Sequence, residues 1–429
     1  MTMRSAIAVL LVAAAPVAAA PDGVIAIQNG RVYTVSGAVI DRGTVLVSGG
    51  KITAVGASVD VPPGATLIDA AGQSVYPGLI DGLTTLGLTE IGSVPGSVDT
   101  TETGDVNPQA QAWVAVHAQS ELIAVARANG ITAALVAPAG GLVSGQSALI
   151  RLAGSTPDAL AVKTRAAMHV VYPSGSPALD IAKTLEEPEL KTFDEWQKEK
   201  KKNQEKDLRR LGNLLDEAKA HGAALGIPSR APKVDLALEA LAPVARGEVP
   251  MVIRADAEDD IRGAAAFAHA RGLKLIIAGG LDAWRCVDAL RAADAAVLVA
   301  VDRLPRREAD PYDAAYANAA ALQRAGLRFA IVTDNASLSR NLPYQAAMAR
   351  AFGLPAEAAL RAITLSPAEI FGVADRMGSI EVGKDANLVV ATGDVMDHRT
   401  SVTHVFIDGV PQSLETRHTR LYQEFKDRP

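Results

Sequence analysis

Short runs of alternating apolar and polar residues occupy both ends of the chain. They fill residues 24–68, with Asn-Gly and Gly-Gly turns between them, and they return at residues 386–391 and 402–409. A period of two, interrupted by such turns, predicts antiparallel strands. We therefore expect one small composite β-sandwich domain built from residues 21–75 and 376–429.

Continuous apolar runs alternate with Ala-rich stretches in the middle of the chain, residues 76–375. Apolar runs followed by helical patterns predict an α/β fold with a parallel sheet. The length of the block favours a (β/α)8 TIM-type barrel over a doubly wound sheet. Strands are predicted at residues 133–137, 170–172, 251–254, 273–278, 296–300 and 329–333, and helices at 111–129, 259–270, 283–292 and 314–325.

A dense run of mixed charge at residues 185–212 interrupts this alternation. Such a run is typical of a solvated helix, here inserted between barrel elements. The alternative is a docking surface or lid, with Phe193 and Trp196 as its apolar contacts.

The first twenty residues are typical of a signal peptide. Arg4 precedes an apolar run at residues 6–15, and small residues follow at positions 18–20. The run is too short to cross a bilayer, which takes about 20 residues. We predict a signal peptide at residues 1–20 and export to the periplasm or beyond, with no membrane attachment after its removal; an uncleaved anchor is the alternative.

Composition adds one exclusion. The net charge is −6, and the sequence contains no basic stripe with interleaved aromatic residues. Nucleic acid is therefore not an expected partner.

Ordered motifs at both ends of the predicted barrel resemble those of the amidohydrolase superfamily. Residues 77–81 read Pro-Gly-Leu-Ile-Asp, residues 362–372 read Ala-Ile-Thr-Leu-Ser-Pro-Ala-Glu-Ile-Phe-Gly, and residues 378–390 follow with Gly-Ser-Ile-Glu-Val-Gly-Lys-Asp-Ala-Asn-Leu-Val-Val. The chain most resembles the imidazolonepropionase-like branch, which has exported members. This resemblance implies a hydrolase of C–N bonds, in non-peptide or peptide-like substrates, that uses zinc or another divalent metal.

The resemblance also implies a metal site of four histidines and one aspartate, and most of these positions hold other residues here. Leu83 and Thr85 occupy the first-strand positions, and Arg254 occupies the fifth-strand position. The sixth-strand position falls near Gly279, again without histidine, whereas Asp334 matches the eighth-strand aspartate. We therefore predict no metal ligands and no metal cofactor, with Asp334 as the candidate catalytic residue.

The remaining chemistry-bearing residues offer few replacements for the missing ligands. His169, beside the strand predicted at 170–172, is a candidate to face the pocket. Lys163 is a candidate for the lysine that bridges metals in the family. A single histidine and Asp334 are too few for zinc, which normally takes about three or four ligands.

Without a metal, the Asp334 carboxylate must be solvated, protonated or paired, because an unpaired buried charge is costly. One hypothesis is that the Arg254 guanidinium pairs with Asp334 across the pocket, with Asp81 nearby. The alternative is that Arg254 reaches solvent and Asp334 caps its loop through the amides of Asn335 and Ala336. Either arrangement would offset the free-energy cost of removing the Asp334 carboxylate from water.

The predicted pocket therefore contains Asp81, Leu83, Thr85, His169, Arg254, Gly279 and Asn335 around Asp334, with a glycine-rich loop at residues 140–146 beside it. Two functions remain open. One is a C–N hydrolase with rearranged chemistry. The other is a pseudoenzyme with a degenerate metal site, which either binds a small-molecule ligand or is the partner subunit of an active homologue. A homo-oligomer is the alternative to a homologous partner subunit.

Overall fold

The computed structural model describes residues 23–174, 192–225 and 232–428. The predicted signal peptide and the first part of the charged run, up to residue 191, lie outside the described residues. Within the described ranges, no helix is both long enough and apolar enough to cross a membrane.

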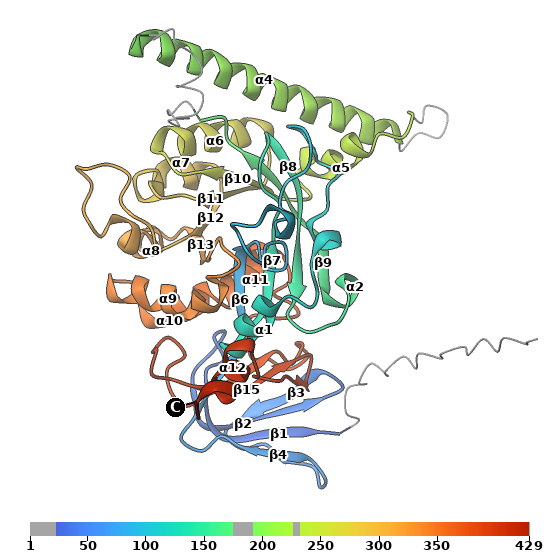
Figure 1. The fold of residues 1–429 in the computed structure, drawn as a ribbon, viewed down its shortest axis with the longest axis vertical. Helices are drawn as coiled ribbons and strands as arrows, with labels where there is room; N and C mark the ends of the chain where they lie inside the picture. Colours follow the sequence, from blue (N-terminus) through green and yellow to red (C-terminus); the bar gives the residue numbers. More distant parts are fainter. Residues whose placement is uncertain (1–22, 175–191, 226–231, 429) are drawn as a thin grey trace, which may run out of the picture.

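Both ends of the chain meet in one eight-stranded sheet, which lies at the lower end of Figure 1. Its strands are β1 (Ile25–Val32), β2 (Ile40–Ser48), β3 (Lys51–Gly56), β4 (Thr66–Asp69), β5 (Ser74–Pro77), β14 (Leu388–Ala391), β15 (Val402–Ile407) and β16 (Val410–Pro411). The pairing of β5 with β14 joins the two ends. This confirms the predicted composite β-structure, whereas the predicted boundaries after residues 75 and 375 stay predictions.

The middle of the chain forms a second eight-stranded sheet that curves into a nearly closed barrel. Its strands run in chain order, β6 (Leu79–Thr84), β7 (Ile131–Val136), β8 (Val143–Arg151), β9 (Ala161–Val171), β10 (Met251–Ala255), β11 (Leu275–Gly279), β12 (Ala296–Val299) and β13 (Arg328–Ile331). All neighbours pair in parallel except β8, which is antiparallel to both β7 and β9. The predicted α/β barrel is therefore confirmed.

Most of the helices lie around the barrel, and the last one lies beside the sheet formed by both chain ends (Figure 1). The described helices are α1 (Glu121–Ala128), α2 (Pro157–Leu160), α4 (Phe193–Leu225), α5 (Leu236–Ala245), α6 (Glu258–Arg271), α7 (Val287–Ala292), α8 (Ala314–Arg324), α9 (Leu342–Ala351), α10 (Ala356–Ala362), α11 (Leu365–Ile370) and α12 (Arg417–Phe425), with 3-10 turns at Pro95–Ser97, Ala112–Ala115, Ala283–Arg285 and Ser339–Asn341. The single helix predicted at residues 111–129 is wrong in its middle, because Ser120 caps a separate helix by accepting a bond from Leu122 N.

The described part of the charged run forms the first half of α4, a 33-residue helix that crosses the end of the molecule opposite the chain-end sheet (Figure 1). Its buried residues are confined to the second half, from Leu211 to His221, and Phe193 is exposed. The described part of the run is therefore a helix with a solvated first half, as predicted.

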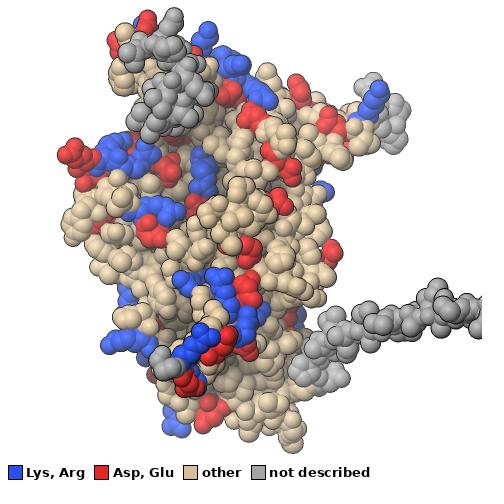
Figure 2. All heavy atoms as spheres, in the orientation of Figure 1, with Lys and Arg blue, Asp and Glu red and all other residues tan. Residues whose placement is uncertain are grey.

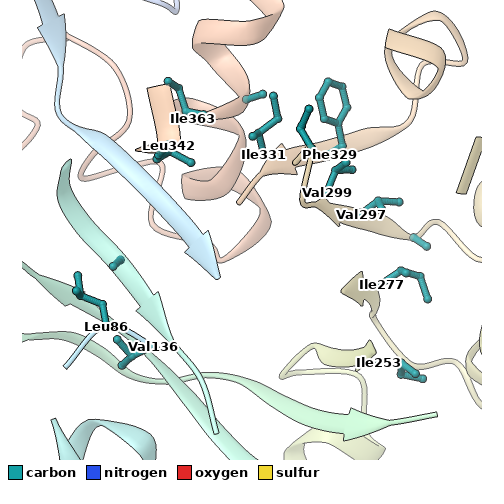
Figure 3. Packing of buried hydrophobic residues seen from close by; sticks show 14 of the residues in the cluster. Leu86, Val136, Ile253, Ile277, Val297, Val299, Phe329, Ile331, Leu342 and Ile363 are labelled. Carbon is teal, nitrogen blue, oxygen red and sulfur yellow. The ribbon is translucent and has the colours of Figure 1, made fainter. Parts of the chain in front are cut away.

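Two apolar layers hold the barrel together. Alternate strand residues fill its interior, among them Val252, Ile276, Leu298 and Val332. The intervening residues point outward against the helices, and Figure 3 shows several of them, including Ile253, Ile277 and Val297. Because successive strand side chains point to opposite faces, Arg254 shares the inward face with Val252.

Charge is spread over the surface. On the face shown in Figure 2, Lys and Arg side chains lie among Asp and Glu side chains, and no large patch of one sign is visible. On this face, recognition is therefore better sought in local sites than in a broad electrostatic field.

Candidate functional site

An ion pair spans the carboxyl end of the barrel. Arg254, near the end of β10, donates from Nη1 to Asp334 Oδ2 at 2.8 Å and from Nη2 to Asp334 Oδ1 at 2.6 Å. The hydrogen bond to Asp334 is the main cause that raises the pKa of Arg254. This bidentate geometry is the strongest form of arginine–carboxylate contact.

Asp334 also closes the barrel. Its backbone N donates to Leu83 O at 2.8 Å, which links the segment after β13 to β6. The residue has a φ of 54°, a left-handed conformation that Asp and Asn tolerate better than most residues. The carboxylate is thus held by its backbone as well as by Arg254.

The predicted pairing of Arg254 with Asp334 is present, and the capping alternative is not seen among the described contacts. Asn335 caps the loop instead, since its side-chain oxygen accepts bonds from Ser337 N at 2.9 Å and Leu338 N at 3.1 Å. Arg303 adds a second cation, with Nη2 3.7 Å from Asp334 Oδ2.

Asp81 does not join this pair, contrary to the expectation that it lies beside it. Its side chain is fully buried, where Oδ1 accepts from Thr333 N at 3.1 Å and Oδ2 accepts from Thr333 Oγ1 at 2.5 Å. Burial raises the pKa of Asp81 to about 7, although the bonds from Thr333 act in the opposite direction. This carboxyl fixes β6 to the segment after β13.

The first-strand positions hold one apolar and one hydroxyl side chain. Leu83 is buried in the cluster that fills the barrel interior. Thr85 follows β6 directly and is half-buried. An alkyl side chain has no lone pair for a metal, so the side chain of Leu83 contributes packing alone.

His169 lies inside the barrel below Arg254. It pairs in register with Val252 and is buried, and its Nε2 has no hydrogen-bond partner among the described residues. Burial, with a smaller effect of Arg254, lowers the pKa of His169 to about 3. The ring is therefore neutral at physiological pH.

Lys163 lies at the opposite end of the barrel from these groups. It stands near the start of β9, and its Nζ donates to Phe371 O at 2.7 Å. Since the carboxyl ends of parallel strands share one end of a barrel, Lys163 cannot reach Asp334. The hypothesis that it corresponds to a bridging lysine is wrong.

Gly279 ends β11 with a φ of 92°, and a Cβ added there would lie 2.3 Å from Asp256 Oδ1. The side chain of Asp256 thus occupies the space above this glycine. Burial raises the pKa of Asp256, which Arg254 partly offsets. Sequence reasoning missed this acid, although its position two residues after Arg254 places it on the same face.

The loop after β12 contributes more charges that sequence reasoning missed. Arg306 and Arg307 approach Asp282 Oδ2 at 3.6 and 3.4 Å, and Arg285 donates to Asp310 at 2.6 Å. Both of these aspartates are almost fully buried at their side chains. The loop is therefore fastened by ion pairs beside the barrel mouth.

The donor set at the mouth differs from that of a metal centre. Within the described ranges, no group of three or more His, Cys, Asp or Glu side chains is placed to hold a metal ion. Both oxygens of Asp334 are already engaged by a guanidinium. The side chains present therefore fit an internal ion pair better than a divalent cation.

Comparison with known proteins gives a consistent result. A sequence model of the amidohydrolase family matches residues 252–411. Amidohydrolase tasK of Hapsidospora irregularis is 24% identical, over 86% of this chain and 40% of that protein. The chain thus spans about two-fifths of the length of the curated relative that it matches.

Solved structures match most of the chain. An amidohydrolase from Thermotoga maritima MSB8 is 27% identical, with a TM-score of 0.79 over 91% of this chain and 99% of that chain. Molinate hydrolase is 17% identical, with a TM-score of 0.56 over 92% and 95% of the two chains, and it supports the fold alone. Together with the barrel and the sheet formed by both chain ends, these similarities place the chain in the amidohydrolase superfamily.

Proposed function

We propose that this protein is a member of the superfamily whose barrel mouth binds a small molecule without the family's metal centre. The observation that carries this proposal is the bidentate pair between Arg254 and Asp334. Zinc sites normally use about three or four protein ligands. Here the matching positions supply an alkyl chain, a hydroxyl and a cation.

The charge of Arg254 argues against a metal more strongly than a missing ligand would. Like charges repel, and at the low effective dielectric of a protein interior the repulsion is larger than in water. A divalent ion would have to displace the guanidinium from Asp334 and then tolerate it nearby. Binding of the ion would therefore cost the favourable contact that Arg254 and Asp334 now make with each other.

A small-molecule site at this end of the barrel is supported by position and by chemistry. The carboxyl ends of barrel strands form the binding face in proteins of this architecture. Arg254, Asp256 and His169 present a cation, an acid and a neutral imidazole there. We also propose that the protein is exported, and that it forms a homo-oligomer or is the partner subunit of an active homologue.

Hydrolysis without a metal is the second candidate function. The proteins that this chain is similar to include amidohydrolases, and burial raises the pKa of Asp256 beside Arg254. A carboxyl with a raised pKa next to an arginine can act as a general base, so a C–N hydrolase with rearranged chemistry would use this group.

Metal analysis tests the main proposal. After incubation with zinc and gel filtration, we expect the full chain to retain far less than about one zinc per molecule, because the expected ligand number is not reached. Elemental analysis by mass spectrometry measures the ratio. Near-stoichiometric zinc that is lost in Asp334→Asn would contradict the proposal.

A gain-of-ligand variant provides the matched control. Leu83→His, Thr85→His and Arg254→His together remove the cation and restore imidazole at three positions. Zinc retention by this variant and not by the natural chain would attribute the difference to these three residues. Retention by both chains would show that the natural donor set suffices.

A further inference from the structure

We propose a second ligand site, for a small dianion bearing a phosphate group, between Lys163 and Lys274 at the amino end of the barrel. We call this site the basal lysine cavity. It lies at the opposite end of the strands from Arg254 and Asp334, and it is independent of the function proposed for the mouth.

The cavity has the size of a small-molecule site. Its volume is about 380 Å³, and its wall combines the amino ends of β10 to β13 with the turn after α11. Volumes of about 300 to 1,000 Å³ are usual for sites that hold small ligands. Phosphate or a small phosphate ester would therefore fit without rearrangement of the barrel.

The acidic side chains that line the cavity are already neutralised. Glu248 receives two bonds from Arg246, at 2.7 and 2.8 Å. Glu369 receives one from Arg361 at 2.7 Å. Asp294, also in the wall, pairs with Arg328 at 2.9 Å.

The two lysines are different. Among the described residues, neither Lys163 nor Lys274 makes an ion pair within 4.0 Å. Because each lining acid is paired to an arginine, Lys163 and Lys274 are the lining charges that have no ion pair among the described residues. A bound dianion would neutralise these two charges.

Lys163 has unused hydrogen-bond donors and open space beside its Nζ for such a ligand. Its Nζ uses one of three possible donors on Phe371 O, at 2.7 Å. The same Nζ lies 3.5 Å from the place of a Cβ on Gly372, so the glycine leaves space beside it. Burial and the charge of Lys274 both lower the pKa of Lys163, against a smaller effect of Asp375.

The chemistry of lysine favours phosphate over a monocarboxylate. An arginine fork matches the two oxygens of a carboxylate, but the arginines at this cavity are already committed to acids. Two ammonium groups act as point charges and favour the ligand with the higher charge. At neutral pH a phosphate group carries about −1.5 to −2 charges.

Titration calorimetry of the full chain with inorganic phosphate tests the site, at low salt and at about 0.15 M ionic strength. We expect one saturable site per chain, with acetate binding at least about tenfold more weakly because it carries a single charge. Methyl phosphate distinguishes an esterified from a free phosphate group as the preferred form. No saturable phosphate binding up to about 10 mM, a Kd at the weak end of small-ligand affinities, would overturn the proposal.

Variants assign the binding to the cavity. Lys163→Gln keeps a donor for Phe371 O and Lys274→Gln is at an exposed position, so both are expected to fold. Each should weaken phosphate binding about tenfold, and the double variant should abolish it. Lys219→Gln makes the same charge change on the exposed side of α4 and should leave binding unchanged. Equal weakening in all three single variants would overturn the assignment.

Discussion

Arg254→Met is expected to lower the free energy of unfolding by about 2 kcal/mol at neutral pH. The change leaves the Asp334 carboxylate, whose side chain is 19% exposed, with Arg303 at 3.7 Å as its remaining cation among the described residues. Breaking a fully buried pair costs about 3–5 kcal/mol and an exposed pair about 0–1 kcal/mol, so this half-buried pair lies between. Urea denaturation followed by tryptophan fluorescence measures the loss.

A double-mutant cycle separates the pair from the loss of the arginine side chain. Asp334→Asn is the appropriate second change, because asparagine also tolerates the left-handed φ of 54° at this position. We expect the double variant to lose less stability than the sum of the two single variants, by about 1 kcal/mol. Strict additivity would show that the two side chains are not coupled.

An exposed ion pair is the matched control for this measurement. Arg399 and Asp397 make a similar close contact at 2.6 Å on the surface, where the Arg399 side chain is 80% exposed. Arg399→Met is expected to leave stability unchanged, because solvent already screens that pair. A loss as large as that of Arg254→Met would mean that burial does not set the strength of these pairs.

The barrel strands that the sequence predicts well are the ones buried on both faces. Residues 251–253, 296–300 and 329–332, within the predicted strands, are continuous apolar runs, and they correspond to β10, β12 and β13 to within a few residues. Burial on both faces requires such runs in a parallel sheet. A continuous run of apolar residues is therefore sufficient to predict these strands.

The strand β8 escapes prediction for the converse reason. The segment expected as a glycine-rich loop at residues 140–146 enters β8 at Val143, and its polar side chains are buried there. Gln146 Nε2 donates to Pro108 O at 2.9 Å, and Ser147 Oγ donates to Ala167 O. A run of small polar residues is typical of a loop. The sequence does not show the distant hydrogen-bond partners that allow such residues to be buried in a strand.

Some contacts of the candidate site could likewise be predicted from the sequence and others could not. The pairing of Arg254 with Asp334 could be predicted, because Arg254 lies near the end of β10 and Asp334 follows β13, and these strands end at one face of the barrel. The partner of Asp81 could not, since the register of β6 against β7 shifts between Asp81 and Thr84 and changes which side chains face inward. Arg303 also escaped prediction, because its position depends on the conformation of a loop.

Asp81→Asn is expected to make the protein more stable than the natural chain in alkaline solution. Burial raises the pKa of Asp81 to about 7, from an unfolded value near 3.8. A carboxyl with a raised folded-state pKa adds stability that is fully present below the unfolded pKa and is lost as the pH rises through the folded pKa. The loss therefore falls between about pH 4 and pH 7.

The size of the effect follows from the width of that window. Each unit of difference between the folded and unfolded pKa corresponds to about 1.4 kcal/mol of stability. Between about pH 5 and pH 8 the natural chain loses the stability that corresponds to close to two of these units. Asparagine does not titrate, so the stability of the variant relative to the natural chain should rise by about 3 kcal/mol over this range. Urea denaturation at several pH values measures the difference.

The local hydrogen bonds allow this substitution. The amide oxygen can accept from Thr333 N and Leu83 N, as Asp81 Oδ1 does now at 3.1 and 3.4 Å. The amide nitrogen can donate to Thr333 Oγ1, whose own proton can turn to Asn335 O at 3.2 Å. No buried group loses its partner, so the variant is expected to fold.

Thr333→Val is the complementary control. It removes the hydroxyl that donates to Asp81 Oδ2 and leaves that oxygen without its closest partner. Because this bond lowers the pKa of Asp81, its loss should move the pH window of destabilisation upward. Curves of stability against pH that run parallel in the natural chain, Asp81→Asn and Thr333→Val would show that Asp81 does not titrate between the two states. Divergence of the Asp81→Asn curve alone would show that Asp81 titrates without control by the Thr333 hydroxyl. Divergence of both variants in the stated directions requires a buried carboxyl whose charged form is stabilised in part by the Thr333 hydroxyl.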